Sequence, residues 1–234
     1  MTKGSNRSRL GGQRQLKVRL RTARSRTPSS QRWLERQLND PYVAAAKREG
    51  YRSRAAYKLI EMDDKFRFLK AGHRVADLGA APGGWSQVAA DRVKSAGGRG
   101  QVVAIDIEEM EALAGVEIIR LDFMDEQAPA RLRAQLRDGG ADVVLSDLAA
   151  PASGHARTDH LRIMALAEAA AEFACEVLAL DGTFLAKVFQ GGTERELLGR
   201  LKREFATVRH VKPPASRAES AELYVLAAGF RSRP

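Results

Sequence analysis

Two lysines and two acids are the residues of this chain whose types and positions could transfer a proton. Lys187 lies in the middle of an apolar run that looks like a buried strand, and a buried ammonium is costly unless a carboxylate pairs with it. Asp147 ends a second apolar run and is the expected partner. Lys58, on a predicted helix, and Glu222, ahead of the last predicted strand, complete the set. A buried lysine of this kind is either a structural ion pair or a group tuned for catalysis.

A glycine-rich segment offers a place for a nucleoside. The chain reads Asp-Leu-Gly-Ala-Ala-Pro-Gly-Gly-Trp over residues 77–85, directly after a short apolar run. Gly79, Pro82, Gly83 and Gly84 would form a turn between a strand and a helix, where missing Cβ atoms allow close approach of the backbone. The spacing is G-x-x-x-G-G, whereas a pyrophosphate-binding turn has G-x-G-x-x-G. We therefore expect a nucleoside cofactor without phosphates, and S-adenosylmethionine is the commonest of these.

Three aspartates follow three predicted strands and could bind such a cofactor. In an open α/β sheet, ligands bind outside the carboxyl ends of the strands. Asp77 closes the first strand beside the glycine turn, Asp106 closes the second and would accept the ribose hydroxyls, and Asp122 follows the third and would hold the adenine amino group. Each aspartate alone could instead cap a helix or a turn. Their recurrence after successive strands favours a binding site.

The elements that would position these residues alternate from Asp40 onward, which indicates a mostly parallel sheet covered on both faces. We predict strands over residues 73–78, 101–106, 116–121, 142–147, 182–189, 207–212 and 223–229. We predict helices over residues 53–70, 84–95, 126–137, 158–180 and 193–205. The last two strands are too close in sequence for a helix between them, so they should pair antiparallel. The pattern predicts an α/β, Rossmann-like fold of the S-adenosylmethionine-dependent methyltransferase type, with a seven-stranded, mostly parallel sheet and an antiparallel last strand.

Positive charge is concentrated at the N-terminus. The 234 residues carry a net charge of +10, and residues 1–36 hold 11 Lys or Arg against the single acid Glu35. These basic residues lie among Ser, Thr, Gly and Gln, a composition with too few apolar residues to fold alone. We therefore divide the chain into a basic, flexible, RNA-binding tail over residues 1–40 and a catalytic domain over residues 41–234. A merely solubilising tail is the alternative.

Composition argues against several classes of protein. No apolar run approaches the roughly 20 residues that cross a bilayer, and none follows the first basic residues as a secretory signal requires. Cys175 is the single cysteine and lies in an Ala-rich helical pattern, so we expect a small core residue rather than a nucleophile. The scattered histidines lack carboxylates at ligand spacing, so no metal is expected. We expect a cytoplasmic protein that binds no membrane.

The charged residues and their surroundings resemble one known family. Lys58, Asp147, Lys187 and Glu222 occur in the order and approximate spacing of the K-D-K-E tetrad of the FtsJ/RrmJ (RlmE) ribosomal RNA 2'-O-methyltransferases. Four surrounding strings also match that family: Tyr-Arg-Ser-Arg-Ala-Ala-Tyr-Lys-Leu over 51–59, the glycine segment through residue 87, Lys-Val-Phe-Gln-Gly over 187–191, and Lys212-Pro213 followed by Ser216-Arg217. The similarity covers residues 40–232. One departure is Asp-Leu-Ala-Ala-Pro over 147–151, where the family usually has Ala-Pro-Asn shortly after the acid.

This resemblance implies a monomeric enzyme that uses S-adenosylmethionine to methylate a ribose 2'-hydroxyl. The implied substrate is a uridine in the aminoacyl-site loop of 23S ribosomal RNA within the large ribosomal subunit. The implied catalytic residues are Lys187, Asp147, Lys58 and Glu222. Trp85 is carried over as a cofactor contact, with core packing as the alternative. The full expected cofactor-binding set is Asp77, Gly79, Pro82, Gly83, Gly84, Trp85, Asp106, Asp122 and Asp147.

Two forms of the reaction and three other functions stay open at this point. Lys187 could act as a neutral base, or as a cation that orients the hydroxyl while its proton leaves late. Burial and the charge of Lys58 favour the neutral form, whereas Asp147 favours the ammonium. The alternative functions are a noncatalytic RNA-binding assembly factor, a 2'-O-methyltransferase acting on another RNA, and a nicotinamide-dependent oxidoreductase. The missing G-x-G-x-x-G argues against the last of these.

Overall fold

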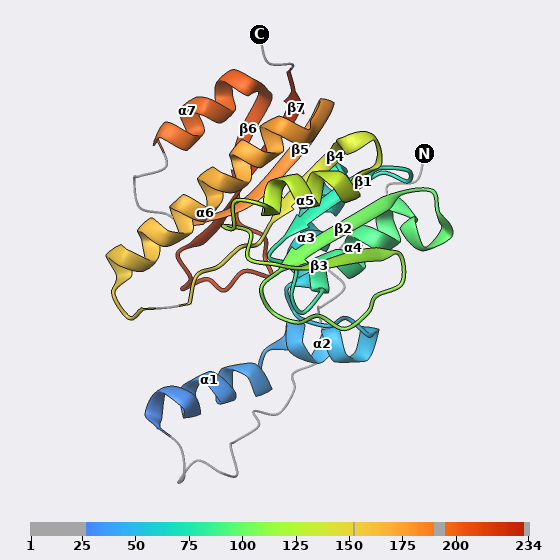
Figure 1. The fold of residues 1–234 in the computed structure, drawn as a ribbon. Helices are drawn as coiled ribbons and strands as arrows, with labels where there is room; N and C mark the ends of the chain where they lie inside the picture. Colours follow the sequence, from blue (N-terminus) through green and yellow to red (C-terminus); the bar gives the residue numbers. More distant parts are fainter. Residues whose placement is uncertain (1–26, 152, 190–194, 232–234) are drawn as a thin grey trace, which may run out of the picture.

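Helices cover both faces of a central sheet in the computed structural model of the chain (Figure 1). The structure describes residues 27–151, 153–189 and 195–231. Within these ranges the strands are β1 (Arg74–Leu78), β2 (Gln101–Asp106), β3 (Val116–Arg120), β4 (Ala141–Ser146), β5 (Leu178–Phe189), β6 (Phe205–Val211) and β7 (Glu222–Phe230). They form a seven-stranded sheet in the order β3-β2-β1-β4-β5-β7-β6, in which β7 pairs antiparallel with both neighbours. The predicted fold class is confirmed.

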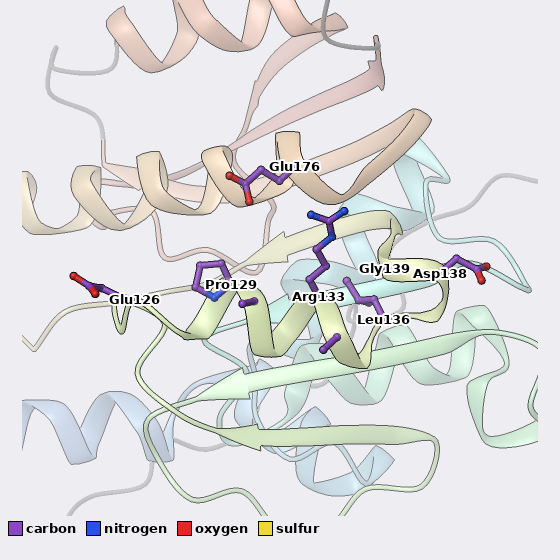
Figure 2. Close-up of a pocket in the computed structure, with 9 residues that line it drawn as sticks. Glu126, Pro129, Arg133, Leu136, Asp138, Gly139 and Glu176 are labelled. Carbon is purple, nitrogen blue, oxygen red and sulfur yellow. The ribbon is translucent and has the colours of Figure 1, made fainter.

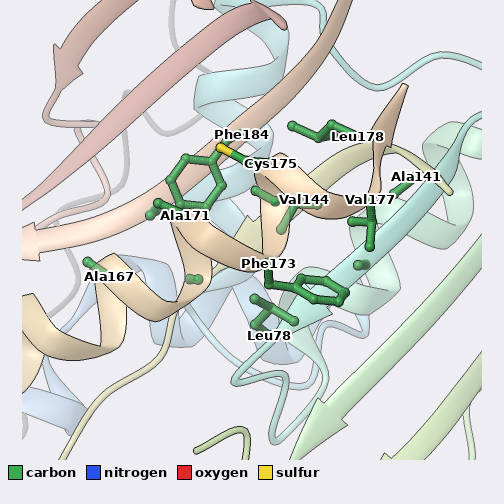
Figure 3. Packing of buried hydrophobic residues seen from close by; sticks show 14 of the residues in the cluster. Leu78, Ala141, Val144, Ala167, Ala171, Phe173, Cys175, Val177, Leu178 and Phe184 are labelled. Atoms are coloured by element: carbon green, nitrogen blue, oxygen red, sulfur yellow. The ribbon is translucent and has the colours of Figure 1, made fainter. Parts of the chain in front are cut away.

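The helices divide into two layers according to the alternation of strand side chains. The described helices are α1 (Pro28–Leu38), α2 (Pro41–Glu49), α3 (Ala56–Phe66), α4 (Gly84–Val93), α5 (Ala128–Gln135), α6 (Ala156–Val177) and α7 (Arg195–Glu204). Leu78 and Phe184 face the layer of α5, α6 and α7, where Phe173 of α6 also packs (Figure 3). Val75 and Leu185 face the layer of α3 and α4. Side chains of consecutive strand residues therefore pack against different helix layers.

Several predicted helices are longer than the observed ones. Helix α3 ends at Phe66 and α4 ends at Val93, because Arg67 and Lys94 adopt left-handed backbone conformations with φ of 55° and 63°. Helix α6 ends at Val177, and β5 begins at Leu178 rather than at residue 182, because Leu178 already pairs with Ala141 of β4. The predicted strand positions otherwise agree with the observed strands to within about two residues.

Two helices were not predicted. Helix α2 begins after Asp40, whose Oδ1 accepts a hydrogen bond from Tyr42 N at 3.0 Å, and it ends at Gly50. Its Ala45 and Ala46 pack in a small cluster with residues of α3 and of the loop before β7, so α2 is part of the folded domain. Helix α1 occupies residues 28–38, within the stretch that the sequence predicted to be a flexible tail. The rest of that stretch, residues 1–26, lies outside the described residues.

Cys175 lies on α6 within the larger core cluster, where Figure 3 shows it among apolar side chains. It is 5% exposed, and its Sγ contacts the carboxylate of Glu204. The expectation of a small core residue is confirmed. None of the described helices combines the length and the hydropathy that a membrane span requires.

Candidate active site

The sheet brings the predicted residues together at the carboxyl ends of its central strands. Asp147, just after β4, donates its backbone N–H to Leu78 O at the end of β1 at 3.0 Å. Gly79, just after β1, donates its backbone N–H to Ile105 O of β2 at 2.9 Å. The ends of β4, β1 and β2 are therefore side by side, and the residues that follow them share one edge of the sheet.

The glycines of the turn make room for the protein's own chain. A Cβ atom at Gly79 would lie 2.8 Å from Leu148 Cα, and Gly79 has a φ of +76°. A Cβ atom at Gly84 would collide with Ser53 Oγ. At both positions the place of a Cβ atom is taken by the segments that follow β4 and precede α3, and the approach of this backbone to a nucleoside stays a prediction. Pro82, at the tip of the turn, is exposed.

Trp85 is buried in the layer of α3 and α4. Its indole Nε1 donates a hydrogen bond to Ala55 O at 2.9 Å, and its ring centroid lies 5.5 Å from that of Tyr224. The side chain is 3% exposed. It therefore packs in the core, which is the alternative that the sequence left open, and its contact with a cofactor stays a prediction.

Asp77 is completely buried beneath the turn. Its Oδ2 accepts a hydrogen bond from Ser86 Oγ of α4 at 2.6 Å, whereas its Oδ1 has no hydrogen-bond partner among the described residues. Burial, reinforced by the nearby charges of Asp147 and Asp106, raises the pKa of Asp77 to about 7 although the Ser86 bond acts in the opposite direction. Among the described residues, no cation is one of the groups that shift the pKa of this buried carboxyl.

The other two aspartates shape the loops that follow their strands. Asp106 Oδ2 accepts the backbone N–H of Ala81 in the glycine turn, and its Oδ1 accepts that of Glu108, both at 2.8 Å. Asp122 is exposed after β3, and its Oδ1 accepts the backbone N–H of Met124. Both aspartates therefore cap turns, which is the alternative that the sequence left open. A carboxylate has about four lone-pair sites, however, so each can also accept hydrogen bonds from hydroxyl or amino groups of a ligand.

These residues fit S-adenosylmethionine better than a phosphorylated cofactor. The carboxyl of Asp77 has an orphaned oxygen, and Asp106 and Asp147 lie close enough to raise its pKa. A ligand with an ammonium, a sulfonium and two ribose hydroxyls would supply both the missing positive charge and hydrogen-bond donors. A phosphate would instead add negative charge beside three acids.

Lys187 and Asp147 form the ion pair that the sequence predicted. Lys187 Nζ lies 3.2 Å from Asp147 Oδ1 and donates a hydrogen bond to Asp147 O at 2.7 Å. The side chain of Lys187 is only 8% exposed. Like Leu185 two residues earlier, it projects from β5 toward the layer of α3 and α4. The carboxylate and the carbonyl together compensate the buried ammonium.

Lys58 and Glu222 form a second pair beside the first. Lys58 Nζ of α3 lies 2.7 Å from Glu222 Oε1 and 2.9 Å from Glu222 Oε2. Ser216 Oγ also donates to Glu222 Oε1 at 2.9 Å. Burial raises the pKa of Glu222, but the charge and hydrogen bond of Lys58, with the hydrogen bond of Ser216 and the charge of Lys187, together outweigh it and hold that pKa below its ordinary 4.5. Glu222 is therefore a carboxylate at neutral pH.

Tyr224 joins the two pairs and was missed in the sequence. Its hydroxyl donates to Asp147 Oδ1 at 3.0 Å and accepts from Lys58 Nζ at 3.2 Å. Burial, reinforced by the charges of Asp147 and Glu222, holds the pKa of Tyr224 well above 10, so its phenol is neutral. Strand periodicity could have identified it, because Tyr224 follows Glu222 by two residues and shares its face of β7. It also pairs directly with Lys187 across the β5–β7 ladder.

Six basic residues flank the site in sequence, so their charges suggest phosphate contacts: Arg52, Arg54, Arg157, Arg162, Lys212 and Arg217. Four of them are engaged within the protein, and Arg52 donates to the carbonyls of Glu111 and Ala112. Arg54 and Arg217 both bind Asp40 Oδ2, at 3.1 Å and 3.3 Å, and Lys212 donates to two carbonyls of its own loop. Arg157 and Arg162 at the start of α6 are exposed. Contact of these residues with RNA stays a prediction.

A separate surface groove of about 720 Å³ lies between α5 and the end of α6 (Figure 2). It is lined by side chains of both signs, including Glu126, Arg133 and Glu176, and by none of the predicted site residues. Among the described residues, no three His, Cys, Asp or Glu side chains gather in a way that could hold a metal ion.

Comparison with protein families and relatives agrees with this geometry. The model of the FtsJ-like methyltransferase family matches residues 51–230. A protein of Azorhizobium caulinodans named ribosomal RNA large subunit methyltransferase E is 64% identical over 218 residues, which cover 93% of this chain and 90% of that protein. The protein of the same name from Bradyrhizobium diazoefficiens is 65% identical over 216 residues, which cover 92% of this chain and 94% of that protein.

A solved structure shares the fold. The crystal structure of a ribosomal RNA methyltransferase from Plasmodium falciparum superposes with a TM-score of 0.69 at 31% sequence identity. The match covers 78% of this chain and 100% of that one.

Proposed function

Because this chain belongs to the FtsJ-like methyltransferase family, we propose that it transfers a methyl group from S-adenosylmethionine to a ribose 2'-hydroxyl of ribosomal RNA in the large subunit. The observation that carries this proposal is the hydrogen-bonded chain Lys187–Asp147–Tyr224–Lys58–Glu222 at the strand edge that also bears the glycine turn. The names of the close relatives support the same substrate class.

The chemistry requires a positioned hydroxyl more than a strong base. When bound, the cofactor supplies a methyl group on a sulfonium, and displacement needs the attacking oxygen in line with the carbon–sulfur bond. As the oxygen–carbon bond forms, the carbon–sulfur bond breaks and the demethylated cofactor leaves. We assign Lys187 to the 2'-hydroxyl, within about 3 Å of the oxygen, where it either accepts the hydroxyl proton as a neutral base or orients the hydroxyl as a cation while the proton leaves late to water. Asp147 would orient Lys187, and Tyr224 would couple that carboxylate to Lys58. Glu222 would hold Lys58 in place.

We propose a uridine of the aminoacyl-site loop as the target nucleotide and the basic N-terminal residues as an auxiliary RNA contact. Residues 1–36 carry 11 cations and one acid, so the stretch can neutralise several phosphates. RNA recognition of this kind depends mostly on shape and phosphate. A chain beginning at Asp40, which keeps the partner of Arg54 and Arg217, should therefore bind large subunits less tightly and with a flatter salt dependence than the full chain.

Transfer of labelled methyl to large subunits from cells that lack their own enzyme tests the proposal. The full chain should place label on one ribose 2'-oxygen, and Lys187→Ala should lower the single-turnover rate at least 100-fold. Lys70→Ala, which removes an exposed lysine outside the site, is the matched control. Label on a base, or an active Lys187→Ala, would contradict the assignment. Binding of subunits without any transfer would favour the assembly-factor alternative.

A further inference from the structure

A single arginine joins three segments around the proposed cofactor site. The connection between β2 and β3, residues 107–115, contains no helix, so its backbone carbonyls need partners outside regular structure. Arg52 Nη1 donates to Glu111 O at 2.8 Å, and Arg52 Nη2 donates to Ala112 O at 2.6 Å. Arg52 Nη1 also donates to Pro82 O of the glycine turn at 3.3 Å. One guanidinium therefore fastens the loop after β2 to the turn after β1.

A hydrogen bond to Gln87 also fixes the backbone of Arg52. Arg52 N donates to Gln87 Oε1 of α4 at 3.0 Å, and Gln87 Nε2 donates to Gly50 O at 2.8 Å. Gln87 thus ties the segment before α3 to the first turn of α4. The guanidinium extends from this anchored point, so the entropy cost of ordering its side chain is partly met by the fold.

Gly83 makes the close approach possible. A Cβ atom there would lie 2.9 Å from Arg52 Nη1 and 3.1 Å from Met110 Sδ. Gly83 also has a φ of +105°, a conformation that residues with a Cβ rarely adopt. The arginine and the loop after β2 therefore both lie directly against the glycine turn.

The loop that Arg52 holds begins at a predicted ribose ligand. Asp106 also connects this loop to the glycine turn. Its carboxylate accepts the backbone N–H of Ala81 in the turn and the backbone N–H of Glu108 in the loop. Asp106 and Arg52 thus link the same two segments, one through their N–H groups and the other through their carbonyls. Moving the loop would change the position of Asp106 relative to the turn.

We propose that Arg52 is a positioning residue that holds the cofactor-binding loops together, and not a phosphate contact as its sequence position suggested. This inference rests on the proposed use of S-adenosylmethionine. Both N–H groups of Nη1 and one of Nη2 are directed at protein carbonyls. The Nη1–Nη2 edge of the guanidinium could otherwise bind a phosphate bidentately, but it is already hydrogen-bonded to the carbonyls of Glu111 and Ala112.

Titration with S-adenosylhomocysteine, the demethylated cofactor, tests this role without catalysis. Arg52→Ala should raise the Kd for S-adenosylhomocysteine at least 10-fold, and Arg52→Lys, which keeps the charge but not the planar fork, should raise it by less. The Kd for large subunits without cofactor, and its salt dependence, should not change. Arg99→Ala removes an exposed arginine elsewhere and is the matched control.

Hydrogen exchange separates positioning from general destabilisation. In ligand-free Arg52→Ala, amide exchange should accelerate over residues 107–113 and at Ala81, while strand amides of β1 and β4 exchange as in the wild type. An unchanged Kd for S-adenosylhomocysteine would overturn the proposal, and so would an equal loss of affinity for large subunits. Failure of the wild type itself to bind S-adenosylhomocysteine would instead overturn the proposed function.

Discussion

Replacing Asp77 by asparagine should make the stability of the protein less dependent on pH. Asp77 is completely buried at the end of β1, where Ser86 binds one carboxyl oxygen and no described group binds the other. Asparagine keeps the shape and an acceptor for Ser86, but it has no ionisable proton. The variant therefore isolates the cost of a negative charge on this buried carboxyl.

The magnitude follows from the raised pKa. Burial raises the pKa of Asp77 from 3.8 to about 7. Between these values the unfolded chain loses its proton while the folded chain keeps it, so the folded state binds more protons and stability falls as pH rises. At 1.36 kcal/mol per pKa unit, the whole shift corresponds to roughly 4 kcal/mol. Asp77→Asn should match the wild type near pH 4 and exceed its free energy of unfolding by about 4 kcal/mol at pH 8.

Urea unfolding of both proteins between pH 4 and pH 8.5, without cofactor, measures this difference. The gap should open from pH 4 to pH 7 and then level off. Asp91→Asn, at an exposed position on α4, is the control and should follow the wild type at every pH. A gap that stays constant across the range would refute the reasoning, because it would show that Asp77 titrates alike in the folded and unfolded states.

Variants of the charged cluster give further predictions. Tyr224→Phe removes the hydroxyl bound to Lys58 and Asp147, and hydrogen bonds to charged groups contribute about 1.5–3 kcal/mol, so single-turnover methyl transfer should slow at least roughly 10-fold while the Kd for S-adenosylhomocysteine is unchanged. An unaltered rate would make the phenol dispensable. Lys58→Met leaves Glu222 buried without its cation, so urea unfolding at pH 7 should show a loss of about 3 kcal/mol, most of which Glu222→Leu in the same chain should restore. Lys58, together with Ser216 and Lys187, holds the pKa of Glu222 below 4.5 in the wild type, whereas burial raises that pKa once Lys58 is removed. The loss should therefore shrink as pH falls from the raised pKa of the variant toward the lowered pKa of the wild type; a loss independent of pH would point to another cause.

The sheet was predictable because its signals are periodic. Apolar strands separated by helical stretches define the order of elements, and the short connection before β7 requires an antiparallel pair. The helix ends were less predictable. Arg67 and Lys94 end α3 and α4 in left-handed conformations without the glycine that usually marks such an end. Helix α2 carries start and stop signals in the sequence, namely Asp40 with Pro41 at its start and Gly50 at its end.

The charged pairs were predictable in part for an energetic reason. A lysine in an apolar strand must find a carboxylate, and Asp147 was the acid at the end of the neighbouring strand. Tyr224 gave only the weaker signal of strand periodicity, because a tyrosine in an apolar strand is an ordinary core residue until its hydroxyl is seen to contact charged groups. The role of Arg52 was not predictable from its charge. Its charge suggested a phosphate, but the sequence does not show which backbone carbonyls the fold leaves unpaired around it.

The same desolvation that makes Asp77 unfavourable in the free protein can contribute to cofactor affinity. Asp77 has an oxygen without a partner, and Asp147 and Asp106 add negative potential around it, whereas the cations Lys187 and Lys58 are already paired with Asp147 and Glu222. A cationic ligand at this edge would reduce the electrostatic repulsion among these acids. Part of its binding free energy would therefore come from relieving a repulsion that is present in the folded protein without ligand. Because no cation of the described residues is among the groups that shift the pKa of Asp77, a sulfonium cofactor would complete the charge of this site better than an anionic dinucleotide would.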